Sequence, residues 1–416
     1  MQLRYGNRTV EFPGVEAEVL QPSCPGALPA SSVAEALERP LGTPPLEELV
    51  RGARTAVVLV SGKDRITRAD LFMGPILRTL QQAGVPPRRT RIIVATGTHV
   101  PFEPSDIPRI AGAQIDPEIE VVGHQCRGEL VSLGMSSKGS ELKVNSLAFE
   151  ADVKILTGRI THHYFAGFTG GRKSVLPGVS GFDTILRNHA MVLSHNGDRP
   201  VHPGTRNGNL EGNPVHEEMM EAARLFQPSF LVNTVLDLEH RLLGVFAGEL
   251  DEAHRAGCLE VQRHFALPVK RQADLVLASC GGDPYDVSFM QAIKTLINCH
   301  DAVRDGGVML LLAECPEGIR EGFLQWTPHE SLSDLVQAVR ANYHLTGHNT
   351  YLLREIQERI RVVLVSSCPG KDVAEMGFQP AGDESAGWLR AMDLLGDVPG
   401  LIYAIPYGNI TVIERS

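Results

Sequence analysis

The stretch Thr55-Ala-Val-Val-Leu-Val60 is short, rich in β-branched residues and apolar after its first residue. Runs of this kind are typical of strands in a parallel sheet that is covered on both faces. The pattern recurs in Arg91-Ile-Ile-Val-Ala95, Asp152-Val-Lys-Ile-Leu156, Ala273-Asp-Leu-Val-Leu-Ala278, Gly307-Val-Met-Leu-Leu-Leu312 and Arg361-Val-Val-Leu-Val365. Amphipathic helical patterns lie between the runs, for example over residues 71–82 and 216–226. The sequence therefore predicts an α/β fold.

The length of 416 residues exceeds what one core usually supports, so we expect two domains. The segment Phe265-Ala-Leu-Pro-Val-Lys-Arg-Gln272 follows a helical stretch and precedes a new strand, which favours a boundary near residue 268. We expect α/β domains over residues 1–268 and 269–416, with mainly parallel sheets and an active-site cleft between them. The last strand, Asn409-Ile-Thr-Val-Ile-Glu414, fits either domain by its periodicity.

The charge balance excludes a general affinity for nucleic acid. The chain has 39 Lys and Arg against 49 Asp and Glu, a formal net charge of -10, so no overall basic field is available. No apolar run is long enough to span a bilayer, and the start has no leader pattern, so we expect a cytoplasmic protein with no membrane partner. The seven cysteines form no CxxC pair and are expected to be reduced. The oligomeric state stays open.

The richest motif is Thr161-His-His-Tyr-Phe-Ala-Gly-Phe-Thr-Gly-Gly-Arg-Lys-Ser-Val-Leu-Pro-Gly178. Gly170 and Gly171 allow backbone N–H groups to approach a ligand closely, and Arg172 and Lys173 add positive charge, which together suit a phosphate or carboxylate. A P-loop needs a glycine directly before its Lys-Ser pair, and Arg172 occupies that position, so the ATP-binding interpretation fails. The alternative is a glycine-rich turn that only packs tightly.

Further polar motifs follow other strands. His99 and Thr98 end the segment Arg91-Ile-Ile-Val-Ala-Thr-Gly-Thr-His99, where ligands of α/β sheets usually bind. A single histidine after a strand is more often an ordinary loop residue, so this assignment depends on its companions. Asn188-His189 lies on an amphipathic stretch, and by itself His189 would be taken for a surface or capping histidine.

Two more groups have the chemistry to hold an acidic ligand. Gln291 and Lys294, in Phe289-Met-Gln-Ala-Ile-Lys294, are one helical turn apart and share a face, from which they could reach across the cleft. The loop Ser61-Gly-Lys-Asp-Arg-Ile-Thr-Arg68 offers Arg65 and Arg68 as a clamp for a carboxylate. Basic residues in a loop are just as often simply solvated.

In this order, the motifs resemble the lactate racemase family that uses a nickel-pincer nucleotide, nickel pyridinium-3,5-bisthiocarboxylic acid mononucleotide. The similarity covers nearly the whole chain, and its most specific part is the segment from His163 to Gly178. It is strongest in Ala95-Thr-Gly-Thr-His99, the His163 to Gly178 segment, Asn188-His189, Gly208-Asn-Leu-Glu-Gly-Asn-Pro214 and Gln291-Ala-Ile-Lys294.

The resemblance implies that Lys173 forms the covalent link to the cofactor and that His189 is the protein ligand of nickel. Ni(II) favours a square-planar arrangement with sulfur donors, and imidazole is an acceptable fourth ligand. The other residues implied to surround the cofactor are Asp64, Thr98, Gly170, Gly171, Arg172 and Ser174.

The resemblance also implies a mechanism. His99 and His163 would be the acid/base pair on opposite faces of the substrate, since imidazole exchanges protons near neutral pH. One histidine removes the hydroxyl proton while the Cα hydrogen leaves as hydride to the cofactor. The resulting 2-keto acid would take the hydride back on its other face, and the second histidine would supply the proton that restores the hydroxyl. Gln291 and Lys294 would hold the carboxylate or the oxygen being oxidised, with Lys294 stabilising the developing alkoxide.

Several positions depart from the family pattern. The early loop Asp64-Arg-Ile-Thr-Arg-Ala69 has one extra residue and lacks the family's proline, so either Arg65 or Arg68 is the functional arginine. Met290 stands where lactate-specific members have tyrosine, and His348 where they have tryptophan. We therefore expect a larger or more polar substrate than lactate.

The predicted function is racemisation or epimerisation of a small-molecule 2-hydroxy acid, with the proteins that synthesise the cofactor as partners. Two alternatives remain. His99, His163 and His189 could hold a metal ion in a hydrolase or lyase, although no HExxH spacing is present. The chain could also be a non-catalytic binding protein for an acidic metabolite.

Overall fold

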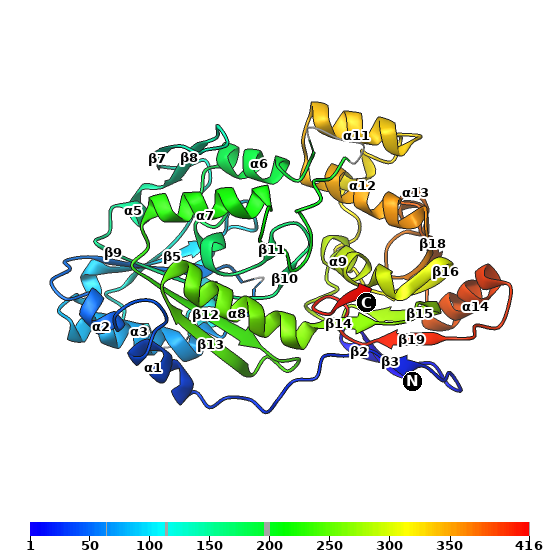
Figure 1. The fold of residues 1–416 in the computed structure, drawn as a ribbon, viewed down its shortest axis with the longest axis horizontal. Helices are drawn as coiled ribbons and strands as arrows, with labels where there is room; N and C mark the ends of the chain where they lie inside the picture. The colour runs from blue at the N-terminus through cyan, green and yellow to red at the C-terminus, as the bar shows by residue number, and fades with distance from the viewer. Residues whose placement is uncertain (64, 113–114, 195–199, 416) are drawn as a thin grey trace. The chain divides into compact units, whose positions relative to one another are not determined.

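The structure, a computed structural model, describes residues 1–63, 65–112, 115–194 and 200–415. The chain divides into two compact units (Figure 1). We call Cys24–Arg263 the central unit, and Met1–Ser23 together with His264–Ser416 the split unit. Each unit contains a mainly parallel sheet with helices, so the predicted α/β fold is confirmed.

A six-stranded sheet forms the middle of the central unit, in the order β13-β12-β9-β4-β5-β6. Neighbouring strands are parallel except β12 and β13, which are antiparallel. The runs predicted as parallel strands in this half are β4, β5 and β9. The bounds are β4 (Ala56–Ser61), β5 (Thr90–Ala95), β6 (Glu120–Gly123), β9 (Val153–Arg159), β12 (Phe230–Leu236) and β13 (Leu242–Gly248).

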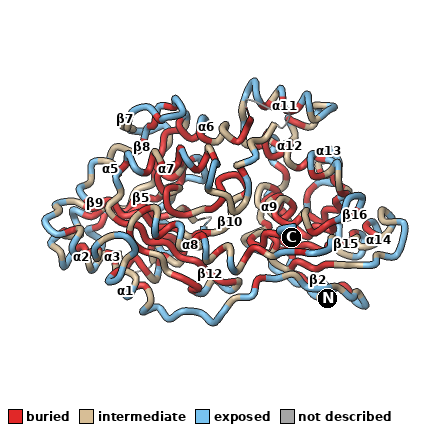
Figure 2. The backbone as a smooth tube through the Cα atoms, viewed as in Figure 1, coloured by how far each residue is buried: buried red, intermediate tan, exposed pale blue. Residues whose placement is uncertain are grey.

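Helices cover both faces of this sheet, and the strands between them are buried (Figure 2). Because successive side chains of a strand point to opposite faces, Val58 of β4 packs in one apolar cluster and Leu59 in another. The first cluster includes residues of α1 (Ser31–Glu38), α2 (Leu46–Leu49) and α3 (Ala69–Gln82), and the second those of α5 (Ser146–Phe149), α7 (Pro214–Phe226) and α8 (Leu250–Phe265).

Shorter elements complete the central unit. They include an antiparallel hairpin, the glycine-rich segment and the helix that follows it. Their bounds are α4 (Ile107–Ile110), β7 (Leu130–Met135), β8 (Glu141–Asn145), β10 (His162–His163), β11 (Gly167–Phe168), the 3-10 helix η3 (Gly171–Ser174) and α6 (Phe182–Ala190).

The split unit contains a six-stranded, fully parallel sheet in the order β18-β17-β16-β15-β19-β3. Its strands are β3 (Glu18–Val19), β15 (Ala273–Ser279), β16 (Val303–Leu312), β17 (Arg361–Val365), β18 (Gln379–Ala381) and β19 (Ile402–Ile405). Its helices are α9 (Phe289–Cys299), α10 (Glu321–Leu324), α11 (Leu332–Ala341), α12 (Leu345–Gln357), α13 (Gly370–Glu375) and α14 (Glu384–Leu395). Throughout the described residues, no helix combines the length and apolar character needed to cross a membrane.

The first residues of the chain belong to the split unit, so the predicted single domain over residues 1–268 needs correction. The hairpin of β1 (Gln2–Tyr5) and β2 (Arg8–Glu11) buries Leu3 in the same cluster as Leu275 of β15, and β3 pairs with β19. The apolar face of the hairpin thus completes the core of the later residues. Sequence periodicity shows that a hairpin face is apolar, but it does not show which core that face joins.

The far end of the chain also stays in the split unit. Strand β20 (Val412–Arg415) pairs in parallel with β14 (Ala266–Val269), and both belong to that unit. The periodicity of residues 409–414 fits either domain, and the structure shows that the strand pairs within the split unit. The predicted boundary at residue 268 falls within β14, a few residues after the division between Arg263 and His264.

The role of the N-terminal hairpin can be tested with Phe12→Ala. Phe12 is 3% exposed in the split unit, so its truncation is expected to lower the free energy of unfolding of that unit by about 3–5 kcal/mol. Hydrogen exchange measured by mass spectrometry should then rise in β15 and β16 and stay unchanged in β4 and β5. The control is Val19→Ala, because Val19 is 49% exposed and a surface change costs less than about 0.5 kcal/mol. Faster exchange in β4 instead would assign the hairpin to the central unit.

Candidate functional site

Two of the predicted motifs meet at the carboxyl edge of the central sheet. The loop after β5 is bonded to the end of the glycine-rich segment, because the N–H of Gly97 donates to the carbonyl of Gly178 over 2.9 Å. Gly97 has a φ of +56°, and a Cβ there would lie 3.2 Å from the carbonyl oxygen of Pro177. This close approach explains the glycine between Thr96 and Thr98 and joins the two loops at the edge where ligands of α/β proteins bind.

The ring of Phe165 brings three predicted site residues together. Its centroid lies 4.4 Å from the ring of His163 and 5.1 Å from the ring of His189. The ammonium nitrogen of Lys173 is 5.5 Å from the same centroid, within the range of a cation–π contact. These residues come from β10, α6 and η3, which are separate elements. Two imidazoles and an amine therefore lie around one aromatic side chain.

The imidazole of His163 has a defined tautomer. The backbone N–H of Ala166 donates to Nδ1 of His163 over 3.3 Å, so the neutral ring carries its proton on Nε2. The ring also stacks on Tyr164, with 5.2 Å between centroids and 6° between planes. The hydrogen bond from Ala166 favours the tautomer with the proton on Nε2, and the stacking on Tyr164 orients the ring.

Arg172 is fully buried, and its guanidinium points to protein groups, whereas the sequence predicts that it binds a ligand. Nη2 donates to the carbonyl of Ala166 over 2.7 Å, and Nη1 lies 2.9 Å from Nε2 of His254. Burial lowers the pKa of Arg172 to about 10, so the guanidinium is still charged at neutral pH. Burial, together with this charge, holds the pKa of His254 well below its ordinary value. Nε2 of the neutral His254 ring also lies 3.0 Å from the carbonyl of Thr169, so it accepts from Arg172 in one tautomer and donates to Thr169 in the other.

The predicted ligand-binding glycines approach protein groups closely. A Cβ on Gly170 would lie 2.8 Å from Oδ1 of Asn233, and one on Gly171 would lie 2.7 Å from the ring of His254. The N–H of Gly171 donates to Oδ1 of Asn233 over 2.8 Å. The hydroxyl of Ser174 donates to the carbonyl of Thr157, also over 2.8 Å. These bonds support the tight-packing interpretation for this part of the loop.

The helix that carries His189 is attached to its neighbour through the preceding residue. Asn188 is fully buried, and its amide donates to the carbonyl of Val215 and to the carboxylate of Glu218, each over 3.1 Å. Both acceptors lie on α7, so the Asn188 side chain fixes the last turn of α6 against α7. The asparagine of the Asn188-His189 motif therefore has a structural role, because it attaches α6 to α7.

The two arginines of the early loop differ. Arg68 forms a two-pronged pair with Asp70, with nitrogen–oxygen distances of 3.0–3.2 Å, and donates from Nη1 to the carbonyl of His240. The hydrogen bond to Asp70 raises the pKa of Arg68. A substrate carboxylate would have to displace Asp70, which argues against Arg68 as the clamp. Arg65 is exposed on the same loop, and Asp64, a predicted cofactor residue, lies outside the described residues.

In the split unit, Gln291 and Lys294 share a face of α9, as predicted. The ammonium of Lys294 donates to the amide oxygen of Gln291 over 2.5 Å. The neighbouring Met290 accepts a contact at its sulfur from the amide of Asn349, over 3.3 Å. His348 is buried, and burial lowers its pKa to about 3, so it is neutral. Polar groups of α12 therefore adjoin the α9 segment.

His99 and Thr98 are exposed on the loop after β5. The N–H of His99 donates to the carbonyl of Thr96 over 2.9 Å, which closes a turn at this point. Sequence reasoning missed Phe165, although it lies within the most specific motif. It also missed Asn213, whose position directly before Pro214 is a signal for a helix N-cap.

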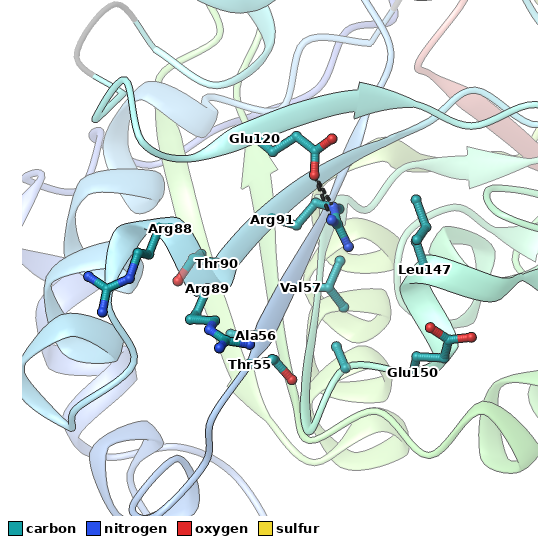
Figure 3. A pocket seen from close by; sticks show the side chains of 11 residues that line it. Thr55, Ala56, Val57, Arg88, Arg89, Thr90, Arg91, Glu120, Leu147 and Glu150 are labelled. Carbon is teal, nitrogen blue, oxygen red and sulfur yellow. Dashed lines mark hydrogen bonds and ion pairs between the residues drawn. The ribbon is translucent and has the colours of Figure 1, made fainter.

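A separate cavity of about 320 Å³ lies at the opposite edge of the central sheet (Figure 3). It opens at the amino ends of β4 and β5, where Arg91 pairs with Glu120 over 2.6 Å. The cavity includes none of the predicted site residues. Over the described part of the chain, no group of three or more His, Cys, Asp and Glu side chains is arranged to hold a metal ion.

Comparison with known proteins identifies the family. Residues 5–199 match the lactate racemase N-terminal domain, and residues 269–413 match the lactate racemase C-terminal domain. The lactate racemase of Thermoanaerobacterium thermosaccharolyticum is 30% identical over 392 residues, which cover 92% of this chain and 90% of that protein. The lactate racemase of Lactiplantibacillus plantarum is 34% identical over 289 residues, 69% of this chain and 66% of that protein.

Solved structures agree in fold. The lactate racemase apoprotein of T. thermosaccharolyticum matches with a TM-score of 0.87 and 28% identity, covering 99% of both chains. A protein from Thermotoga maritima matches with a TM-score of 0.70 at 15% identity, a likeness in fold alone. The resemblance seen in the motifs is thus confirmed over both halves: the chain belongs to the lactate racemase family, and it is an isomerase of the racemase class.

Proposed function

We propose that this protein racemises or epimerises a 2-hydroxy acid with the help of a nickel-pincer nucleotide bound through Lys173. The observation that carries the proposal is the meeting of His163, Lys173 and His189 at the ring of Phe165, in a chain of the lactate racemase family. A racemase must handle protons at its substrate oxygen, and His163 has a ring suited to that task.

The residues present fit this cofactor. A pincer nucleotide brings carbon and sulfur donors of its own, so it needs one protein ligand for nickel and one amine for attachment. His189 and Lys173 are such a pair, since both contact the same buried ring. When bound, the group would supply an acceptor for hydride, which is what reversible loss of the Cα hydrogen requires.

The roles of the other residues follow from their chemistry. His163 would exchange a proton with the substrate oxygen at Nε2, since Nδ1 accepts from Ala166. We propose His99 as the second acid/base group, needed for the opposite enantiomer. Lys294 and Gln291, already bonded to each other, would hold the carboxylate or the oxygen being oxidised. Arg65 or Arg68 would make a further carboxylate contact, and Arg68 would have to leave Asp70 to do so.

We further propose a substrate larger or more polar than lactate. The reason is the polar neighbourhood of Met290, where the amide of Asn349 contacts its sulfur and His348 is buried next in the chain. A panel of single-enantiomer 2-hydroxy acids with apolar, hydroxylated and carboxylated side chains tests both points. We expect loss of optical rotation with at least one polar member and slower turnover of lactate. Unchanged rotation over the whole panel, with the cofactor loaded, would contradict the proposed function.

Attachment of the cofactor can be tested with Lys173→Ala and Lys173→Arg. Both variants lack the amine, and the arginine variant keeps the positive charge over the Phe165 ring. We expect intact-mass spectrometry to show the adduct on the unsubstituted protein and on neither variant, with racemisation lost in both. An adduct of unchanged mass on Lys173→Arg would refute this attachment site. Nickel and sulfur contents are measured in parallel, because zinc without added sulfur would favour the histidine-bound hydrolase.

The acid/base pair can be tested with His99→Gln and His163→Gln. Loss of a positioned general acid or base costs about a hundredfold or more in rate, so each variant should lose at least that factor in kcat. Only preparations with a full complement of adduct and nickel are compared, which separates proton transfer from cofactor loss. Near-normal turnover in either variant would exclude the two-histidine scheme.

A further inference from the structure

The backbone that carries Phe165 is held from three directions. The carbonyl of Phe165 accepts from the side chain of Asn213 over 2.9 Å, and the next carbonyl, of Ala166, accepts from Arg172 over 2.7 Å. The carbonyl after that, of Gly167, accepts from the N–H of Gly208 over 3.0 Å. The Phe165 side chain itself is 2% exposed. The position of the ring is therefore fixed by the bonded backbone and by the packing around the side chain.

Asn213 connects this support to the segment 208–214. Its Oδ1 caps α7 by accepting from the backbone N–H groups of Val215 and His216, each over 3.2 Å. Its Nδ2 remains available for the carbonyl of Phe165. The side chain thus links the start of α7 to the turn that follows β10, and an asparagine is needed because it donates and accepts at once.

The contacts to Phe165 use the specific geometry of an aromatic ring. The ring of His163 meets it edge to face at 87°, and the ring of His189 meets it at 66°. The ammonium of Lys173 lies near the ring face, where the negative charge of the π system attracts cations. An aliphatic side chain fills space but offers neither an edge nor a charged face.

We propose that Phe165 is a positioning residue for the reaction. Its ring sets where Lys173, His189 and His163 lie relative to one another, and so aligns cofactor attachment, nickel binding and proton exchange. This inference rests on the proposed function for the roles of those three residues. Displacement of a reacting group by about 1 Å can cost about a hundredfold in rate, so a fixed ring has a measurable effect.

The test compares Phe165→Leu with a matched control, Phe226→Leu. Phe226 is also fully buried in the central unit, and the ammonium of Lys154 lies 5.7 Å from its ring. Phe226 makes none of the contacts described for the candidate site. Leucine is chosen over methionine because a thioether can bind a soft metal ion. The two variants should have similar melting temperatures.

The first measurement uses the cofactor-free protein with labelled histidines. Ring currents of Phe165 act on the imidazole protons of His163 and His189, so the proton resonances of both should move in Phe165→Leu and stay in place in Phe226→Leu. Nuclear Overhauser contacts from Phe165 to both imidazoles in the unsubstituted protein are measured as well. If the leucine variant does not fold, these Overhauser contacts alone test whether Phe165 touches both imidazoles. Their absence would overturn the proposal.

The second measurement uses cofactor-loaded protein. We expect kcat of Phe165→Leu to fall by about a hundredfold with a much smaller change in KM, and kcat of Phe226→Leu to stay within a few-fold. Equal kcat in the two variants would overturn the positioning role. Failure of the proposed function gives a different result, because the unsubstituted protein would then lack the adduct or the turnover, while the resonance shifts would remain.

Discussion

The guanidinium of Arg172 is the constraint on which the candidate site depends. A buried charge is costly unless its donors are bonded, and Arg172 directs Nη2 to Ala166 and Nη1 toward His254 and the carbonyls of Thr169 and Gly170. Among the described residues, its Nε has no hydrogen-bond partner. The glycine-rich segment therefore folds around the guanidinium of Arg172, which has no contact with solvent. Phe165, Lys173 and His163 all lie on this wrapped segment.

This arrangement gives Gly170 and Gly171 a packing role. A glycine-rich loop beside two basic residues predicts a binding site for an anion, with backbone N–H groups facing the ligand. At Gly171 the N–H faces Asn233, and the space a Cβ would occupy is taken by His254. The glycines permit the loop to lie against α8 and β12, and Lys173 is the basic residue that contacts Phe165. Arg172 thus supports the loop from inside, while the adjacent Lys173 contacts the ring at the candidate site.

The sequence predicts the strands of the central sheet well, but it predicts the direction of charged side chains poorly. Continuous β-branched runs are enough to identify β4, β5 and β9 as parallel strands, since only a doubly covered sheet buries such runs. The direction of a charged side chain is a different matter. Arg172 is buried because α8 brings His254 beneath the loop, and Arg68 is occupied because Asp70 lies two residues later. Such partners are set by tertiary contacts. The motif resemblance predicts the site residues, whereas the contacts of Phe165 with three of them are seen only in the structure.

The division of the chain has a consequence for its synthesis. The split unit needs Met1–Ser23 together with His264–Ser416, so β1, β2 and β3 are synthesised before the whole central unit and meet their partners only after it. Strand β3 has its partner β19 only when residue 405 has emerged. Until then an amphipathic hairpin and an open strand edge are exposed, which are features that promote aggregation. A nascent chain that ends before β19 therefore exposes both features.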